Sequence, residues 1–282
     1  MAKILFTKMV GAGNDFIVID NRSKKASIKK SILSSFAKSV CERKTSIGAD
    51  GILVLEASKR SDFKMRIFNA DGTEAEMCGN GLRCAAKYVY NNAKSAKKTL
   101  KVEAIAGLYV AEITSKDNVK IKMEDPKDKR LGLQLKINTR AIRVSYINTG
   151  VPHTVIFVHG LDDIDIDPIG RTIRYHDQFK PRGTNVDFVE IKDEKNIRMR
   201  TYERGVEGET LACGTGAVAS AVIAGHRIQV TSHKSQDTRH KINVHTKGGV
   251  LKISFKKVGS NIKDVYLEGE AKEVFKGEVD HV

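Results

Sequence analysis

The chain has 282 residues, 40% of them hydrophobic, so it is long enough for one large domain or two of ordinary size with well-buried cores. No apolar stretch approaches the length that spans a bilayer, and the first residues lack the apolar core and cleavage site of a signal peptide, which predicts a cytoplasmic protein with no membrane partner. The formal charge of +15 is spread over short lysine clusters without a nucleic-acid-binding signature, so a solvated surface is favoured over a nucleic-acid partner.

Short strands are predicted along most of the chain, because alternating or β-branched runs are bounded by Gly, Asn, Asp and Lys turns. In chain order, the predicted strands lie at residues 4–10, 16–20, 51–57, 63–68, 100–113, 119–123, 154–160, 186–191, 197–202, 241–246, 250–255 and 265–271. Helical patterns occupy residues 27–42, 79–92 and 214–226, with a helical turn near 168–178. This order is typical of an α+β protein rich in antiparallel sheet and not of an alternating βαβ protein.

The four cysteines exclude two common uses of this residue. Their spacing is neither the dense, regular spacing of a disulfide scaffold nor the CxxC or short Cys/His spacing of a zinc site. We therefore expect no disulfide framework and no metal site.

Two segments of the chain resemble each other, and each contains one cysteine. Residues 65–81 (MRIFNADGTEAEMCGNG) and 199–216 (MRTYERGVEGETLACGTG) share Met-Arg, an aromatic residue, a polar residue, an acidic loop with glycine, and Cys-Gly-x-Gly. The Met-Arg pairs lie 134 positions apart and the cysteines 135, which indicates one inserted residue in the second loop. Upstream, GNDFIVI (13–19) is matched with TNVDFVEI (184–191). These matches predict two structurally equivalent halves.

Each repeated cysteine precedes a glycine-rich turn that opens a predicted helix. The unpaired N–H groups and the dipole of a helix N-terminus stabilise an anion, and they favour the thiolate form of a cysteine placed there. If the halves face each other, Cys78 and Cys213 reach one stereocentre from opposite sides, so that one thiolate removes a proton and the other thiol delivers one. The two helix starts would also stabilise the charge that develops when a carbon beside a carboxylate is deprotonated.

The chain resembles diaminopimelate epimerases nearly from end to end. The resemblance is carried by GAGNDF (11–16), IGAD (47–50), FNADG (68–72), MCGNGLRC (77–84), PHTVIFV (152–158), GTNVDF (183–188), YERG (202–205) and ETLACGTGA (209–217). It implies an isomerase that interconverts LL- and meso-diaminopimelate, for lysine and peptidoglycan synthesis, with neither PLP nor a metal as cofactor. The implied partner is the small-molecule substrate, and a homodimer is left open.

The same resemblance implies the roles of individual residues. Cys78 and Cys213 are the catalytic acid/base pair, and His153 and Glu203 flank the thiols and tune their protonation. The implied substrate-binding residues are Asn14, Asn69, Gly79, Asn80, Asn185, Glu203, Arg204, Gly214 and Thr215. Arg204 is suited to a two-pronged hydrogen bond with the distal carboxylate. Cys41 and Cys84 are expected to be small buried hydrophobic residues.

The repeat and the resemblance together predict the domain organisation. We expect two pseudo-symmetric domains of similar fold, each a mostly antiparallel β-sheet wrapped around a central helix, with the active site in the cleft between them. The N-terminal domain takes residues 1–125 and a C-terminal strand at 270–282, and the C-terminal domain takes residues 126–269. The strand pattern breaks at 124–128, where we expect a hinge.

Three positions depart from the family pattern. Gly51 stands where some members carry a substrate-contacting Gln, and Val151 stands where others carry Asn before Pro-His. The loop GVEGET (205–210) is one residue longer than is usual. Side-chain contacts at these positions are therefore not transferred to this chain.

Three alternative functions remain open at this stage. A proline or hydroxyproline racemase would use the same two cysteines on a substrate with a single carboxylate. A hydrolase would use Cys78 as a nucleophile with His153 and would leave Cys213 dispensable. A basic nucleic-acid-binding protein would be indifferent to both cysteines and would bind less tightly as salt rises.

Overall fold

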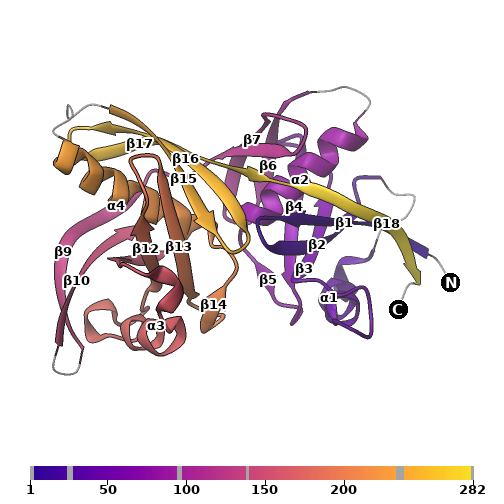
Figure 1. The fold of residues 1–282 in the computed structure, drawn as a ribbon. Helices are drawn as coiled ribbons and strands as arrows, with labels where there is room; N and C mark the ends of the chain where they lie inside the picture. The colour runs from indigo at the N-terminus through magenta and orange to yellow at the C-terminus, as the bar shows by residue number, and fades with distance from the viewer. Residues whose placement is uncertain (1–2, 24–27, 94–96, 138–139, 233–237, 281–282) are drawn as a thin grey trace. The chain divides into compact units, whose positions relative to one another are not determined.

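The computed structural model describes residues 3–23, 28–93, 97–137, 140–232 and 238–280. Strands dominate these residues and helices are few, so the predicted α+β class is confirmed (Figure 1). The chain divides into two compact units, Met1–Lys122 with Glu268–Val282 (unit 1) and Met123–Leu267 (unit 2). None of the helices in the described ranges is both long and apolar enough to cross a membrane.

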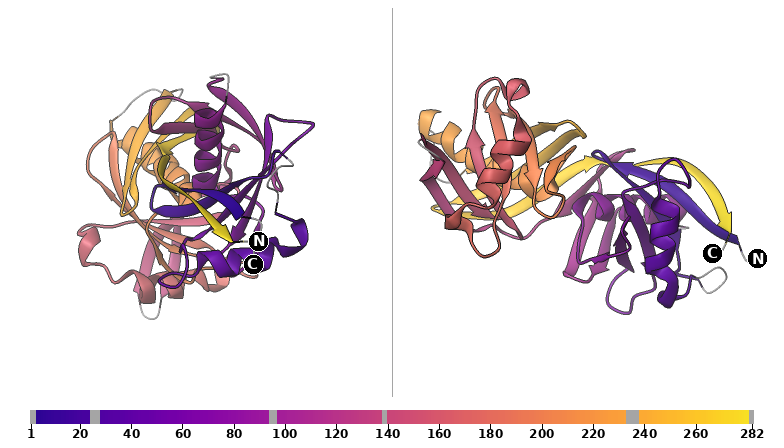
Figure 2. Two further views of the ribbon diagram at one scale, coloured as in Figure 1. Left: turned by 90° about the vertical axis from the view of Figure 1, so that its right-hand side faces the viewer. Right: turned by 90° about the horizontal axis from the view of Figure 1, so that it is seen from below.

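Unit 1 contains two helices and nine strands among its described residues. They are β1 (Lys3–Gly11), β2 (Asn14–Asp20), α1 (Leu33–Cys41), β3 (Gly51–Glu56), β4 (Phe63–Asn69), β5 (Glu74–Ala75), α2 (Gly79–Asn92), β6 (Thr99–Ala104), β7 (Gly107–Ile113), β8 (Asn118–Lys122) and β18 (Lys272–Asp280). The last strand pairs antiparallel with the first over most of their lengths, so β1 and β18 lie side by side (Figure 2).

Unit 2 also contains two helices among its described residues. Its elements are β9 (Lys127–Ile137), β10 (Arg140–Asn148), β11 (Pro152–Phe157), α3 (Ile166–Arg174), β12 (Asn185–Ile191), β13 (Asn196–Glu203), β14 (Gly208–Thr210), α4 (Gly214–Ser232), β15 (Thr238–Thr246), β16 (Gly249–Val258) and β17 (Asn261–Glu270). The boundary with unit 1 falls within β17.

The strands of the two units pair in the same order and the same directions. In unit 1, β1–β2 is antiparallel, β2–β3 parallel, β3–β4 antiparallel and β4–β6 parallel. In unit 2, β10–β11 is antiparallel, β11–β12 parallel, β12–β13 antiparallel and β13–β15 parallel. The sequence repeat is therefore accompanied by a repeat of strand topology.

The register of these strands corrects one of the sequence matches. Ile52 pairs with Phe68 in unit 1 and Val186 pairs with Tyr202 in unit 2, so each residue is displaced by the same 134 positions. Asn185 therefore corresponds to Gly51 and not to Asn14, because β12 is the counterpart of β3. The counterpart of β2, which carries Asn14, is β11.

Helices α2 and α4 each lie among the strands of their own unit (Figure 1). α2 contacts β1–β4, β6–β8 and β18, and α4 contacts β10–β13, β15 and β16. Every residue of α4 from 216 to 225 is buried, and most are Gly, Ala, Ser or Val, whose small side chains let strands approach the helix from several directions. The first residues of both helices are thereby held in place by the surrounding strands.

The predicted helix at 79–92 is confirmed, whereas other elements differ from the predictions. The first helix is shorter than predicted and starts at Leu33, after a 3₁₀ turn at Lys30–Ile32, and α4 runs to Ser232. The segment near 168–178 holds a complete helix, α3, whose Gly170 packs against Tyr202 where a Cβ would lie 2.5 Å from the tyrosine Cβ. Tertiary packing thus overrides the poor helix propensity of its proline and glycine.

Candidate active site

Cys78 is the N-cap residue of α2. Its carbonyl oxygen accepts the first helical hydrogen bond from Leu82 N at 2.8 Å, and its Sγ accepts from the Gly81 N–H at 3.4 Å. The half-buried sulfur thus takes the position that Ser or Asp oxygens usually occupy at a helix start. Partial positive charge at this end of the helix stabilises negative charge on the sulfur.

A network of side-chain amides in unit 1 includes Asn80, which follows Cys78 by two positions on α2. Asn80 Nδ2 donates to Asn14 Oδ1 at 2.6 Å, and Asn14 Nδ2 donates to Asp50 Oδ2 at 2.8 Å. Arg43 Nη2 in turn donates to the other oxygen of Asp50 at 2.8 Å. Each amide nitrogen carries two N–H groups, so Asn14 and Asn80 each retain one donor beyond these bonds.

Arg83 is a fully buried cation on the first turns of α2. Its Nη2 donates to Asn80 Oδ1 at 2.8 Å and its Nη1 donates to Gly79 O at 3.4 Å, whereas its buried Nε has no partner among the described residues. Burial lowers the pKa of the guanidinium, and the neighbouring thiols of Cys84 and Cys78 act in the opposite direction. Arg83 therefore fixes the side chain of Asn80 and places positive charge near Cys78.

Cys213 takes the same position at the start of α4 in unit 2. Its carbonyl oxygen accepts from Ala217 N at 2.9 Å, as Cys78 accepts from the residue four positions ahead. Its Sγ lies 3.4 Å from Thr215 Oγ1. Cys213 is only 6% exposed, so it is more deeply buried than Cys78.

A chain of polar contacts leads from Cys213 into the interior of unit 2. Thr215 Oγ1 lies 3.0 Å from His153 Nε2, and His153 Nδ1 lies 2.7 Å from Asp187 Oδ2. If His153 donates Nδ1–H to Asp187, its Nε2 is left to accept from the Thr215 hydroxyl. Thr215 Oγ1 can then accept a hydrogen bond from the Cys213 thiol. These contacts therefore favour the protonated thiol form of Cys213, whose S–H can donate to Thr215.

Acidic side chains surround Cys213. Burial raises the pKa of the Cys213 thiol well above its ordinary value, and the negative charges of Glu203 and Asp187 raise it further. Burial also raises the pKa of Glu203. Cys213 thus has acidic neighbours, whereas Cys78 has a buried arginine. The two cysteines share a backbone position but differ in electrostatic surroundings.

Asn185 and Arg204 are neighbours in unit 2. Asn185 Nδ2 donates to Pro152 O at 3.0 Å, and Asn185 Oδ1 accepts from Arg204 N at 2.8 Å. The Arg204 guanidinium makes one long bond, at 3.4 Å to Arg182 O, and pairs with no carboxylate among the described residues. Asn185 therefore braces the backbone next to a guanidinium whose charge is not neutralised.

The other implied residues have simpler surroundings. Asn69 is exposed at the end of β4, where its Nδ2 donates to Thr73 Oγ1 at 3.0 Å. Gly51, which pairs with Asn69, has no space for a side chain, since a Cβ would lie 2.4 Å from Phe68 O. Gly79 and Gly214 are the first residues of α2 and α4.

Several residues of these networks were not singled out from the sequence, among them Arg43, Asp50, Arg83, Asp187 and Gly216. Asp187 gives the clearest signal, because a carboxylate stands in a buried strand of otherwise apolar residues, VDFV. A Cβ on Gly216 would lie 2.5 Å from Asp187 Oδ1, so only glycine leaves room for the carboxylate beside the helix.

Cys41 and Cys84 are both buried, as the sequence predicts. Burial raises the pKa of each thiol to about 12. Among the described residues, no hydrogen bond joins either thiol to the networks around Cys78 and Cys213. No three His, Cys, Asp or Glu side chains lie together as a metal-binding group in the ranges that the structure describes.

Comparison with solved structures first defines the class of fold to which the chain belongs. A phenazine biosynthesis protein of the PhzF family from Bacillus anthracis superposes with a TM-score of 0.73 over 100% of both chains at 15% identity. A probable proline racemase from Agrobacterium radiobacter K84 superposes with a TM-score of 0.68 over 98% of this chain and 93% of its own, at 13% identity. The chain therefore has the fold shared by PhzF proteins and proline racemases.

Sequence comparison narrows the class to one family. The profile of the diaminopimelate epimerase family matches residues 6–128 and 145–274. A diaminopimelate epimerase from Caldanaerobacter subterraneus subsp. tengcongensis is 44% identical over 98% of this chain and 99% of its own. The chain belongs to the diaminopimelate epimerase family and is accordingly an isomerase.

Proposed function

We propose that the chain interconverts LL- and meso-diaminopimelate in the cytoplasm, for lysine and peptidoglycan synthesis, by passing a proton across one α-carbon between Cys78 and Cys213. Family membership supports the substrate and the reaction. The mechanism is supported chiefly by one observation, namely that both cysteines cap the N-terminus of a central helix through equivalent backbone hydrogen bonds. The proposal requires no PLP and no metal ion.

The proposed catalytic state has both units closed on one substrate. In this state the units are pseudo-symmetric domains, each with its sheet around a central helix, and the active site is the cleft between them. The matching strand topology supports this arrangement, because it gives each unit one cysteine in the same place. A reaction that removes a proton from one face and adds one to the other needs two such groups.

The helix starts serve a second purpose in this proposal. Removing the α-proton puts negative charge onto the adjoining carboxylate, which is already an anion. Backbone N–H groups that point outward from a helix N-terminus stabilise such charge where it develops. The residues assigned to this end of the substrate are Gly79, Asn80, Gly214 and Thr215. Asn14 joins them through its hydrogen bond with Asn80.

The resting enzyme is proposed to carry the negative charge on Cys78 and the proton on Cys213. Arg83 supports the first assignment, and the raised pKa of Cys213 together with its contact to Thr215 supports the second. Iodoacetamide reacts with thiolates, so brief treatment at pH 7 should alkylate Cys78 before Cys213. Peptide mass spectrometry gives the order, and earlier alkylation of Cys213 would refute the assignment.

Arg204 is proposed to bind the distal carboxylate of the substrate. Its unneutralised guanidinium provides a fork of N–H donors for a carboxylate. Arg204→Gln should raise KM for diaminopimelate by roughly tenfold to 100-fold, the range of a lost charge-assisted hydrogen bond, with a smaller change in kcat. Arg182→Gln is the matched control, because Arg182 contacts Arg204 through its carbonyl and has an exposed side chain. Equal KM values for the two variants would exclude this role.

Isotope labelling tests the two-base reaction directly. In heavy water, LL-diaminopimelate should give meso product that contains deuterium from the first turnover, while recovered LL substrate remains almost unlabelled, because each thiol serves one face. Mass spectrometry at low conversion measures both pools. Equal early labelling of the two pools would indicate a single base and would contradict the proposal.

The proline racemase alternative rests on a similar fold alone. Proline has one carboxylate, so it would leave the Arg204 guanidinium without an anionic partner. Turnover assays with proline, hydroxyproline and diaminopimelate distinguish these substrates. The hydrolase alternative predicts a covalent acyl intermediate on Cys78, which mass spectrometry of the enzyme during turnover would detect.

A further inference from the structure

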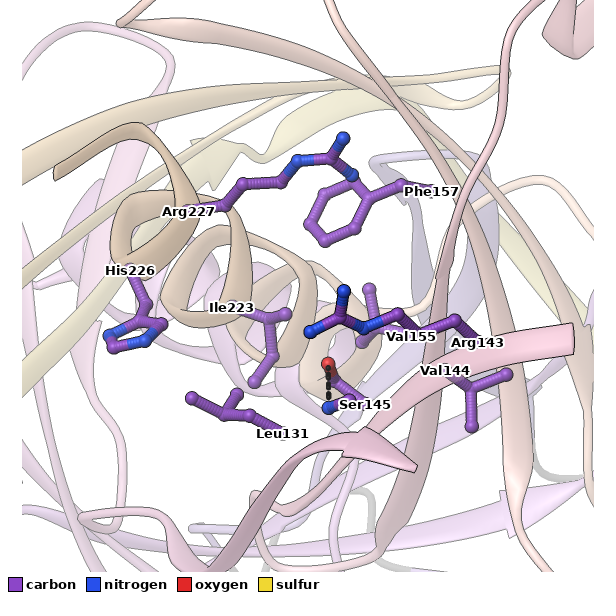
Figure 3. A pocket seen from close by; sticks show the side chains of 10 residues that line it. Leu131, Arg143, Val144, Ser145, Val155, Phe157, Ile223, His226 and Arg227 are labelled. Carbon is purple, nitrogen blue, oxygen red and sulfur yellow. Dashed lines mark hydrogen bonds between the residues drawn. The ribbon is translucent and has the colours of Figure 1, made fainter. Parts of the chain in front are cut away.

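Unit 2 contains a cavity of about 410 Å³ between α4 and the strands β9, β10 and β11 (Figure 3). Its lining residues are Leu131, Gly132, Arg143, Val144, Ser145, Val155, Phe157, Ile223, His226 and Arg227. The volume lies in the range of small-molecule sites, which is about 300–1,000 Å³.

The cavity is separate from the networks around Cys213. None of the residues assigned to catalysis or substrate binding is among those that line it. Ile223 follows Gly214 by nine positions on α4, so the cavity begins roughly 13 Å along the helix from the residue after Cys213. A ligand in this cavity would therefore occupy a second site on unit 2.

Part of the cavity lining is apolar. Val155 and Ile223 are almost fully buried, and Phe157 and Leu131 add further apolar side chains. The Arg227 guanidinium stacks on the Phe157 ring, with its Cζ 4.6 Å from the ring centroid. This surface suits a hydrocarbon or aromatic group.

The lining also includes the cationic side chains Arg143 and Arg227. Figure 3 shows the Arg143 guanidinium extending from β10 toward Ile223. Gly132 makes room for it, since a Cβ at this position would lie 3.0 Å from Arg143 Nη2. No carboxylate pairs with Arg143 among the described residues, and none of the ten side chains that line the cavity is acidic.

His226 contributes a polar atom without a partner. Its Nδ1 is buried and makes no hydrogen bond with any described residue. Burial lowers the pKa of the imidazole, and the charges of Lys257 and Lys129 lower it further, so the ring is neutral at pH 7. In the neutral tautomer with the proton on Nδ1, this atom has one N–H to donate, and leaving it buried and unpaired is unfavourable. In that tautomer a bound acceptor would complete this site.

We propose that the cavity binds a small organic carboxylate, whose apolar body lies against Val155, Phe157 and Ile223 while its carboxylate accepts hydrogen bonds from Arg143 and His226. A planar carboxylate matches the fork of a guanidinium, and the local excess of positive charge selects an anion. The apolar part of the lining distinguishes such a ligand from an inorganic ion. This site does not depend on the assignment of the two catalytic thiols.

The test uses 3-phenylpropanoate as the probe and the ¹⁵N-labelled full chain. Titration should shift the amide signals of Gly132, Ser145 and Ile223 with saturation. The neutral analogue 3-phenylpropanamide, which has the same shape, and inorganic phosphate, which lacks the apolar body, should each bind at least roughly tenfold more weakly, the effect of losing one charge-assisted hydrogen bond or the apolar contact. Equal binding of the amide, or shifts confined to other residues, would overturn the proposal.

Variants give a second test. Arg143→Gln should weaken binding of the probe by roughly tenfold or more, because it removes the charged donor. Arg140→Gln is the matched control, since Arg140 is exposed on the same strand and does not line the cavity. His226→Phe keeps a ring in place and removes the donor, so it should also weaken binding. Unchanged affinity in both cavity variants, or an equal loss in Arg140→Gln, would contradict the assignment.

Discussion

Cys78→Ala and Cys213→Ala should each lower kcat/KM for diaminopimelate by roughly 10³-fold or more in both directions of the reaction. In the proposed two-base mechanism each variant lacks the group that exchanges a proton with one face of the α-carbon, and general acid–base groups contribute roughly 10²–10⁴-fold apiece. Reversing the direction does not restore activity, because the missing thiol is needed either as the acid or as the base. The measurement is the initial rate of LL-to-meso conversion and of the reverse, followed by chiral chromatography.

Cys84→Ala provides the matched control. Cys84 lies on the same helix as Cys78, is fully buried and has a pKa raised to about 12, so it cannot supply a thiolate near neutral pH. Removing its sulfur leaves a small cavity and should cost about 1 kcal/mol of stability while kcat/KM stays within a few-fold of the parent value. If Cys84→Ala lost as much activity as Cys78→Ala, damage to α2 would explain both results. Near-normal turnover in either catalytic variant would rule out the two-base mechanism.

The start of each central helix could be predicted from the sequence because the information is local. A polar residue at the N-cap, two glycines and a run of small residues specify a helix start within a few positions. Both helices begin at the residue after the cysteine, at Gly79 and Gly214. The positions of the two thiols at the helix starts could therefore be predicted from the sequence.

Contacts between residues that are distant in the sequence could not be predicted in the same way. His153 and Asp187 are 34 positions apart and come together because β11 and β12 are parallel neighbours, with His153 opposite Asn185. A strand sequence does not specify its partner or its register. The similarity of the two sequence segments therefore aligned Asn185 with Asn14, whereas the hydrogen-bonded register of the strands places Asn185 at the position of Gly51.

The hairpin of β9 and β10 was missed, and α3 was predicted only as a helical turn near 168–178. Leu131, Leu133, Leu135 and Ile137 alternate along β9 as they do in a strand, but only Leu135 is fully covered, and the first part of the strand is charged and largely exposed. Its stability comes from its pairing with β10. In α3, Ile166 and Ile173 are buried against the core of unit 2, which compensates for Pro168 and Gly170 within the helix.

Gly216→Ala should both destabilise unit 2 and impair catalysis. The new Cβ would lie 2.5 Å from Asp187 Oδ1 and 3.2 Å from His153 Cε1. Asp187 cannot move without disturbing its bonds to His153 at 2.7 Å and to Thr201 Oγ1 at 2.8 Å, all within a closely packed interior. Overpacking of this kind costs about 1–3 kcal/mol, which corresponds to a fall of roughly 2–12 °C in the unfolding midpoint for a domain of this size. Differential scanning calorimetry without substrate measures the change.

Gly81→Ala is the control that the repeat supplies, since Gly81 stands three residues after Cys78 as Gly216 stands after Cys213. Its Cβ would be crowded by the Leu53 Cδ2 methyl alone, at 3.0 Å, which is the end of a flexible side chain, whereas Cys78 Cβ and Phe16 Cζ would lie at ordinary contact distances of 3.6 and 3.7 Å. Alanine also has the higher helix propensity, by about 1 kcal/mol, so Gly81→Ala should change stability by about 1 kcal/mol or less in either direction. Equal destabilisation by the two substitutions would show that the backbone conformation at both helix starts requires glycine. A larger loss in Gly216→Ala, accompanied by a fall in kcat, would locate the requirement in the buried contact between Asp187 and His153.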